Sequence, residues 1–283
     1  MFDLHTHILP QIDDGAASWA EAYQMLEIAA KDGINVLAAT PHFLEGWFTP
    51  TPAEIKAGVE RLNQYAQRQS LPIRVIPGME VALCPDIPRL FQANRLLTLN
   101  DEGQYLLVEL PANEVPIYTE SLLFELQLMG ITPVLAHPER NRVIANNPAW
   151  VLDQVKRGVL VQLTADSLLG RFGKNTRQIS QELLRAGVVH GLGSDAHSSQ
   201  HRTPTLKAAT AKITELLGQE AGHRLATADN IKSNMALADI EGFFNNTCHA
   251  QAFPDEVLSY SPALCRRLLN AGQKWVKQVM GFK

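Results

Sequence analysis

The residues with the clearest chemical potential stand at the start of the chain, in the segment MFDLHTH. If this segment forms a β-strand, alternate side chains face the same side, so His5 and His7 point in one direction. Two imidazoles placed in this way can bind a single divalent metal ion. An HxH pair is common by chance, however, so its meaning depends on which residues the rest of the chain brings beside it.

Apolar, strand-like runs alternate with helix-like segments along the chain and must position these residues. We expect strands at residues 1–4, 36–40, 73–77, 105–109, 132–135, 159–163 and 188–192. Helices are expected at residues 18–31, 51–70, 118–129, 148–157 and 175–186, most of them followed closely by a glycine that ends the helix. Seven strand-then-helix units predict an α/β protein with a parallel sheet. We predict a distorted seven-stranded (β/α) barrel that resembles a TIM barrel, with an open doubly wound sheet as the alternative.

In a parallel barrel the active site lies at the carboxyl ends of the strands. Six of the seven expected strands lead there into histidines or carboxylates, and the sixth offers the neutral Gln162 and Thr164. The charged candidates are His5, His7, Asp13, Asp14, His42, Glu80, Glu109, His137, Glu139, Asp195 and His197. Each alone has an ordinary structural explanation, but together at one edge they favour two or three bound metal ions. Imidazole and carboxylate donors suit manganese, iron or zinc without choosing between them.

The bulk composition limits the classes of function. The 283 residues are 46% hydrophobic and carry a formal net charge of −4, so there is no basic excess for nucleic-acid binding. The first residues do not resemble a signal peptide, and every apolar stretch is too short to span a membrane. Three widely spaced cysteines favour a reducing cytoplasm, and none has the Cx5R spacing of a cysteine phosphatase.

A series of short motifs strengthens this interpretation. In order, MxDxHxH, DDG, TPH, GxE, VEL, AHPER and SDAH resemble the PHP (polymerase and histidinol phosphatase) superfamily. The resemblance is strongest to bacterial protein-tyrosine phosphatases found with capsule and exopolysaccharide genes, and it runs from Met1 to about Asp239. It implies the PHP fold for a phosphatase domain of residues 1–243. Residues 244–283 lie outside the resemblance and are expected to form a C-terminal helical extension.

The resemblance also implies roles for individual residues. It assigns a first metal site to His5, His7, Glu80 and Asp195, a second to Glu80, Glu109 and His137, and a third to Asp14, His42 and His197. Arg140 and Arg202 match two arginines that contact the phosphate, and Asp13 is expected to order its loop. The remaining histidines are expected to be structural or solvent-facing, although His201 is a candidate proton donor; they are His190, His201, His223 and His249.

The implied activity is that of a cytoplasmic, Mn²⁺-dependent protein-tyrosine phosphatase. Metal-activated hydroxide would attack the phosphorus of phosphotyrosine on a bacterial tyrosine kinase that regulates polysaccharide export. The alternatives are a small-molecule phosphatase acting for example on histidinol phosphate, an amidohydrolase, and a non-catalytic binding module. Glu109 favours the first over the histidinol branch, and Glu80 stands where amidohydrolases commonly use a carboxylated lysine.

Three other segments have two interpretations each. Residues 43–48 are rich in aromatics and form either a lid over the substrate ring or a loop packed on the barrel rim. Arg142, Arg171 and Arg177 are expected to be solvated, with contacts to an acidic peptide as the alternative. The basic C-terminal extension is expected to pack on the barrel, or else to dock on the kinase or on the membrane surface.

Overall fold

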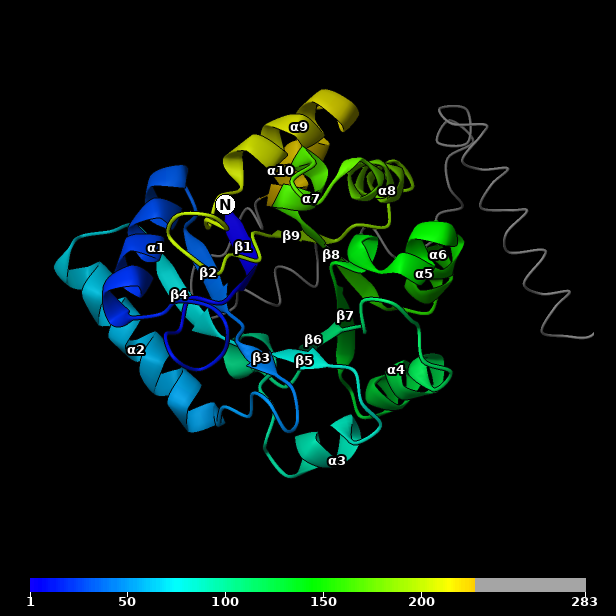
Figure 1. The fold of residues 1–283 in the computed structure, drawn as a ribbon, viewed down its shortest axis with the longest axis horizontal. Coiled ribbons are helices and arrows are strands. Elements are labelled where there is room, and N and C mark those ends of the chain that lie inside the picture. Colours follow the sequence, from blue (N-terminus) through cyan, green and yellow to red (C-terminus); the bar gives the residue numbers. More distant parts are fainter. Residues whose placement is uncertain (227–283) are drawn as a thin grey trace, which may run out of the picture.

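The computed structural model describes residues 1–226. Parallel strands curl around the centre of the molecule, and the helices surround them on the outside (Figure 1). The predicted domain boundary at residue 243, the C-terminal extension and His249 lie outside the described residues. Within the described part, no helix has both the length and the apolar character needed to cross a bilayer.

The strands form two sheets in which every neighbouring pair is parallel. One sheet has the order β1-β2-β4, and the other has the order β3-β5-β6-β7-β8-β9. The strand bounds are β1 Phe2–Thr6, β2 Val36–Ala39, β3 His42–Phe43, β4 Arg74–Pro77, β5 Glu80–Ala82, β6 Tyr105–Glu109, β7 Thr132–Ala136, β8 Leu160–Thr164 and β9 Gly191–Gly193.

Each of the seven expected strands overlaps a strand of the structure, but two short strands, β3 and β5, were not anticipated. They follow β2 and β4 after interruptions that each contain a residue unsuited to a regular ladder, Pro41 and Gly78. Their register pairs His42 directly with Glu80. These two short strands therefore place two of the predicted ligands side by side.

The two sheets meet where the strands end. The His5 carbonyl accepts a hydrogen bond from the Asp195 backbone N–H at 2.8 Å, and the His7 N–H donates to the Ala196 carbonyl at 2.9 Å. The Asp3 carboxylate accepts the backbone N–H of Ser194 at 2.8 Å. These bonds hold the end of β1 against the end of β9, so the first and the last strand of the described fold contribute to the same edge.

The helices agree with the sequence expectations wherever local signals exist. The five expected helices are all present, and their bounds differ by a few residues at most. The capping box of α2 is confirmed, because the Thr51 hydroxyl accepts the Glu54 N–H at 3.2 Å and Glu54 accepts the Thr51 N–H at 2.7 Å. The helix bounds are α1 Trp19–Asp32, α2 Pro52–Arg68, α3 Ile87–Gln92, α4 Thr119–Leu128, α5 Arg142–Asn146, α6 Ala149–Lys156, α7 Ala165–Leu169, α8 Lys174–Arg185, α9 Lys207–Leu217 and α10 Gln219–Ala226, with 3₁₀ turns η1 Leu99–Asp101 and η2 Pro138–Arg140.

Buried apolar side chains pack around the strands whose carboxyl ends form the site. One cluster packs the strands against the outer helices, and a second, smaller cluster includes Tyr105 and Leu107 of β6. Glu109 follows at the same two-residue spacing, so it faces the same side of the strand as these two residues. In β8, Leu160 belongs to the second cluster, and Gln162 follows it in the same way. On this face, β6 and β8 thus change from apolar to polar as they reach their carboxyl ends.

His190, which was expected to be either structural or solvent-facing, is buried just before β9. Its Nδ1 accepts the Val161 N–H at 3.1 Å, and burial lowers its pKa to about 4. The unfolded chain takes up this proton near pH 6.5, so the free energy of unfolding should fall as the pH drops from about 6.5 to about 4. This group alone should contribute about 3 kcal/mol to that fall.

A variant that keeps the acceptor but cannot be protonated isolates this contribution. His190→Asn should show a shallower loss of stability over the same pH range, measured by urea unfolding at a series of pH values. His201→Asn, at an exposed position, is the matched control and should follow the wild type. Equal pH slopes in wild type and His190→Asn would contradict the prediction.

Candidate metal centre

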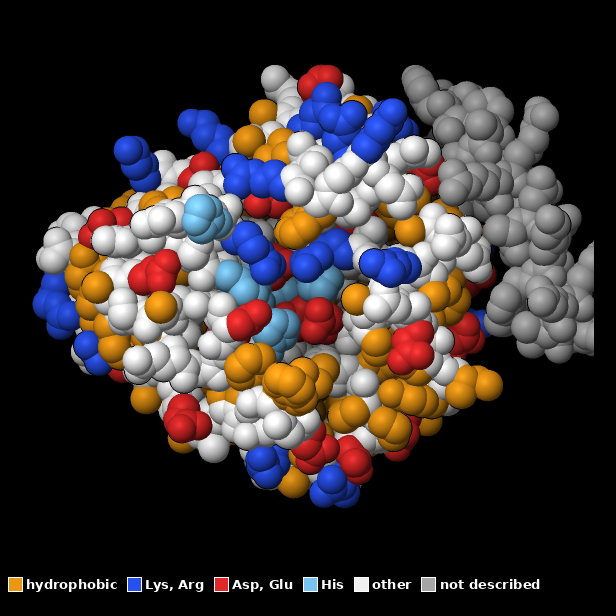
Figure 2. Space-filling model, viewed as in Figure 1, with side chains coloured by type: hydrophobic (Ala, Val, Ile, Leu, Met, Phe, Trp, Pro, Cys, Tyr) orange, Lys and Arg blue, Asp and Glu red, His pale blue; other side chains and the backbone are white. Residues whose placement is uncertain are grey.

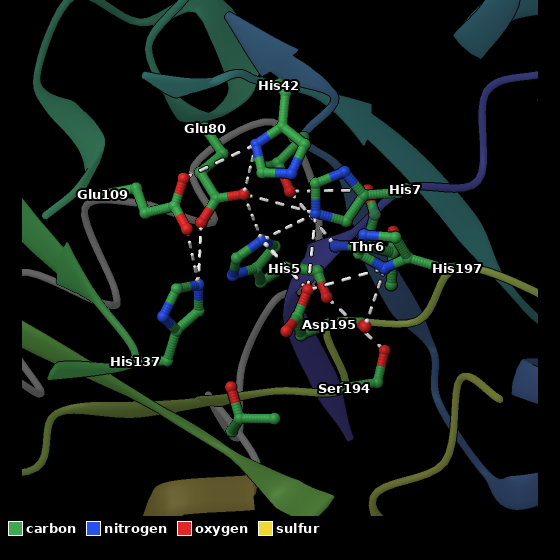
Figure 3. A network of polar contacts seen from close by, with 12 residues as sticks. His5, Thr6, His7, His42, Glu80, Glu109, His137, Ser194, Asp195 and His197 are labelled. Atoms are coloured by element: carbon green, nitrogen blue, oxygen red, sulfur yellow. Dashed lines mark hydrogen bonds and ion pairs between the residues drawn. The ribbon is translucent and has the colours of Figure 1, made fainter. Parts of the chain in front are cut away.

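All nine predicted metal ligands meet at the carboxyl edge of the strands. Figure 3 shows eight of them, and Asp14 is the ninth. Their donor atoms fall into four groups, and within each group every donor atom lies within 4.8 Å of the others. The groups are His7, Asp14, His42 and His197; His5, His7 and Glu80; His5, His137 and Asp195; and His42, Glu80 and Glu109. Several donors therefore belong to more than one group, and the division among individual metal ions stays a prediction.

Glu80 lies at the centre of the cluster and is fully buried. Its Oε2 atom is 3.0 Å from both His5 Nε2 and His42 Nδ1, and its Oε1 atom is 2.9 Å from His137 Nε2. Burial raises the pKa of this carboxyl, but the charge of His5 and hydrogen bonds from the neighbouring imidazoles hold it well below its ordinary value. A carboxylate with imidazole nitrogens around both oxygens suits a bridging ligand.

The two histidines of the HxH pair face each other in a way that a cation would stabilise. His5 Nε2 and His7 Nε2 are 3.0 Å apart. The other ring nitrogens are already held, since His5 Nδ1 lies 2.9 Å from Gln162 Oε1 and His7 Nδ1 lies 2.7 Å from Asp13 Oδ2. If these Nδ1 atoms carry the protons, two Nε2 lone pairs converge on one point, as metal ligation requires. The donor set therefore fits divalent metal ions.

Asp13 orders the loop after β1, as expected, and it also holds a ligand in place. Its two oxygens accept the backbone N–H groups of Gly15 and His42, each at 2.9 Å. Gly15 passes so close to His7 that a Cβ at this position would lie 2.0 Å from the His7 carbonyl oxygen. Although burial raises the pKa of Asp13, its bond to His7 lowers it, so the carboxylate stays ionised beside the imidazole.

The donor group of His7, Asp14, His42 and His197 is the most open to solvent. The Asp14 side chain is 56% exposed, and its Oδ1 atom lies 3.4 Å from His197 Nε2 and 3.6 Å from His42 Nε2. The hydrogen bond from His197 lowers the pKa of Asp14 to about 2. This side of the cluster is therefore the one that solvent reaches.

Asp195 links the cluster to both predicted phosphate-binding arginines. Its Oδ1 atom faces His5 and His7, at 3.7 and 3.4 Å. Its Oδ2 atom pairs with Arg140, and with Arg202 Nη2 at 2.5 Å. Figure 2 shows Lys and Arg side chains along one rim of the hollow in which the histidines and acids are visible. Arg140 and Arg202 are themselves 29% and 31% exposed, so an incoming anion can reach them.

The profile of the capsular polysaccharide synthesis family CpsB/CapC matches residues 1–234. The chain belongs to this family. It is 37% identical to the tyrosine-protein phosphatase YwqE of Bacillus subtilis over 225 residues, covering 80% of this chain and 88% of the relative. It is 36% identical to the putative tyrosine-protein phosphatase CapC of Staphylococcus aureus over 207 residues, covering 73% and 81% of the two chains.

Other CpsB/CapC proteins extend the comparison. The identity to the tyrosine-protein phosphatase CpsB of Streptococcus pneumoniae is 25% over 230 residues, covering 80% of this chain and 94% of that protein. A solved structure from a study of YwqE and CpsB superposes with a TM-score of 0.76, covering 80% of this chain and 91% of its own, at 37% identity. That study describes YwqE and CpsB as metal-dependent tyrosine phosphatases.

Two strand-end candidates support this CpsB/CapC site without joining the donor groups. Gln162 orients His5, as described above, and also lies 3.4 Å from the backbone nitrogen of His137. Glu139 is buried and accepts the Thr164 N–H at 3.1 Å, and burial raises its pKa. Both side chains thus hold the backbone around the site, Gln162 from the sixth predicted strand and Glu139 from the end of the fifth.

The aromatic segment 43–48 forms a small hairpin beside His42. Leu44 and Phe48 exchange backbone hydrogen bonds of 2.7 and 2.9 Å, and the Phe48 ring stacks on the His42 ring with centroids 6.1 Å apart. Phe48 thus packs against the rim of the site, while the Trp47 side chain is 80% exposed. The lid over the substrate ring stays a prediction, and Trp47 is the residue available for it.

Phe172 was missed by the sequence reasoning, although it contacts both arginines. Its ring centroid lies 4.5 Å from the guanidinium carbon of Arg140 and 5.9 Å from that of Arg202. It stands between Gly170 and Gly173, whose φ angles of 89° and 95° make the tight loop that returns the chain to the site. A Gly-Arg-Phe-Gly sequence after a predicted strand was the available signal.

We expect Phe172 to orient the two arginines, because an aromatic face attracts a guanidinium. Phe172→Leu should raise KM for a phosphotyrosyl peptide about fivefold, with the metal content unchanged. Phe172→Tyr keeps the aromatic face and should restore the wild-type KM. Steady-state kinetics and metal analysis of both variants check this, and equal KM values for the leucine and tyrosine variants would contradict it.

Proposed function

We propose that this chain is a metal-dependent protein-tyrosine phosphatase that removes phosphate from a bacterial tyrosine kinase regulating capsular or exopolysaccharide synthesis. One observation supports this most directly. Nine metal-type donors and two arginines, Arg140 and Arg202, converge at one edge of the sheet in a chain whose relatives are named tyrosine phosphatases. Such a site suits the hydrolysis of an anionic phosphoric monoester.

The finer description of the fold belongs to the same proposal. We assign residues 1–243 to a distorted seven-stranded barrel of the PHP type, in which β2 with β3 and β4 with β5 each supply one barrel strand. The hydrogen bonds between the ends of β1 and β9 support this closure. A cytoplasmic location is proposed with it, because three widely spaced cysteines favour a reducing compartment.

We assign the metal ligands to the nine donors named above, with Glu80 as the bridge and Mn²⁺ as the preferred ion over iron or zinc. When bound, such ions lower the pKa of a coordinated water and neutralise charge on phosphoryl oxygens. His5 and His7 are pre-organised for metal binding, because the Nδ1 atom of each contacts a partner that orients the ring.

Besides the metal ligands, the proposed phosphate site contains the two arginines Arg140 and Arg202. A guanidinium stays protonated at any physiological pH, so Arg140 and Arg202 can donate hydrogen bonds and charge to phosphoryl oxygens but are poor proton donors. Both now pair with one oxygen of Asp195, which a bound phosphate would replace as their partner. The phenolate that leaves from phosphotyrosine has a conjugate acid with a pKa of about 10 and needs less protonation than an alkoxide.

The test compares three substrates under controlled metal content. Protein freed of metal with a chelator should not hydrolyse a phosphotyrosyl peptide, a phosphoseryl peptide or histidinol phosphate, and it should melt at a lower temperature than the reloaded protein. Reloading with Mn²⁺ should restore turnover of the phosphotyrosyl peptide alone. Faster turnover of histidinol phosphate would favour the small-molecule phosphatase, and no metal-dependent turnover of any substrate would favour a binding module.

A further inference from the structure

A pocket of about 340 Å³ opens directly beside the metal-ligand cluster. Its lining includes Glu109 and His137 from the donor groups and the phosphate-binding candidate Arg140. From there it extends between residues 110–113 and residues 138–142, two segments that none of the catalytic assignments uses beyond Arg140. Any chain attached to a group held at the cluster therefore has this pocket next to it.

The two walls of the pocket are joined rigidly. Asn141 is buried and donates hydrogen bonds from Nδ2 to the Pro111 and Glu114 carbonyls, at 2.7 and 2.8 Å. Its Oδ1 atom accepts the N–H groups at the start of α5, and the Arg142 N–H donates to the Ala112 carbonyl at 2.9 Å. The pocket is thus formed in advance, as is usual for ligand sites.

Arg142 adds a positive charge to a lining that also holds Arg140 and the carboxyl group of Glu109. Its side chain is exposed on the lining, and none of the ion pairs found within residues 1–226 involves it. Arg171 differs, because it pairs with Asp166 at 3.2 Å and its Nη1 lies 3.2 Å from the His201 carbonyl. Of the three arginines considered from the sequence, Arg142 is the one that lines this pocket, where it can meet an acidic group beside the cluster.

We propose that this pocket binds a residue flanking the phosphotyrosine in a polypeptide substrate, and that Arg142 selects an acidic side chain there. The inference rests on the proposed phosphatase function. The phosphate itself occupies the cluster and the guanidinium groups of Arg140 and Arg202, so the positive charge of Arg142 remains for a neighbouring carboxylate. Leu110, Ala112 and Pro138 supply apolar surface for the adjoining backbone and side-chain carbons.

Binding and turnover of matched peptides test this assignment. Three phosphotyrosyl peptides differ only in carrying Glu, Gln or Lys beside the phosphotyrosine, and their non-hydrolysable phosphonate forms report affinity by fluorescence anisotropy with the Mn²⁺-loaded protein. The wild type should bind the Glu peptide about threefold more tightly than the Gln peptide, and the Lys peptide most weakly. This preference should shrink at high salt, because the contact is exposed.

Variants decide which residue is responsible. Arg142→Glu should reverse the order of the Glu and Lys peptides, and Arg142→Gln should remove the order. Arg68→Glu makes the same charge change at the exposed end of α2, across the molecule from α5 (Figure 1), and should keep the wild-type order. The pocket assignment would be overturned if the wild-type protein bound the three peptides with equal affinity. It would also be overturned if Arg142→Glu kept the wild-type order of affinities.

The outcomes separate this inference from the proposed function. Metal-dependent turnover of all three peptides at one common rate would contradict the pocket assignment and leave the phosphatase intact. No metal-dependent turnover of any phosphotyrosyl peptide would contradict the phosphatase itself, and the pocket assignment with it.

Discussion

Glu80→Gln should remove almost all phosphatase activity, with a loss in kcat/KM on the order of 1,000-fold. The substitution preserves shape but removes the negative charge from a buried side chain that approaches His5, His42 and His137. Because that carboxylate is the proposed bridge, the metal content of the purified protein should fall together with the rate. Metal analysis and kinetics with a phosphotyrosyl peptide after addition of Mn²⁺ measure the two effects.

The control for Glu80→Gln is the same chemical change far from the cluster. Glu125→Gln alters an exposed residue of α4 and should leave rate and metal content at wild-type values. Circular dichroism of the Glu80→Gln protein establishes that it is folded. A folded Glu80→Gln protein with full metal content and at least a tenth of the wild-type rate would rule out the bridging role.

Arg140→Lys and Arg202→Lys should each lower kcat/KM about 100-fold, with metal content unchanged. Lysine keeps the positive charge but cannot present the planar pair of donors that a phosphate or carboxylate accepts. Both guanidinium groups converge on one oxygen of Asp195, so the two losses should not add in the double variant. Steady-state kinetics of the two single variants and of the double variant measure this.

A surface arginine provides the comparison. Arg157 also pairs with a carboxylate, that of Glu120 at 2.6 Å, but it lies on the exterior beside α6. Arg157→Lys should keep the wild-type rate, because an exposed ion pair contributes little. Unchanged kcat/KM in Arg140→Lys and Arg202→Lys would exclude both arginines from the phosphate site and leave them as partners of Asp195 only.

Much of the architecture could be predicted from local patterns. Apolar runs of strand length and helix-like segments have characteristic periods, so each of the seven expected strands and five expected helices has a counterpart in the structure. The capping box at Thr51 could be predicted from the sequence for the same reason, since all of its atoms come from four consecutive residues. The interruptions that create β3 and β5 were harder to read, because such short strands exist only through pairing with a neighbour.

The sequence by itself determined which residues are available for chemistry and at which end of each strand they stand. The two-residue spacing of His5 and His7 and the polar residue after nearly every apolar run are local properties, and parallel strands bring such ends to one edge. The candidate ligands were therefore accessible without a structure, once the alternation of strands and helices was recognised.

Only the tertiary structure decided what each of these residues contacts. Gln162 orients His5 from 157 positions away, and Asp32 caps the start of α9 by accepting the Leu206 and Lys207 N–H groups at 2.6 and 2.9 Å. Phe172 likewise reaches Arg140 through the loop between α7 and α8, and Arg142 lines the pocket from the start of α5. Such contacts depend on the register of strands and the course of loops, which the period of a local segment does not encode.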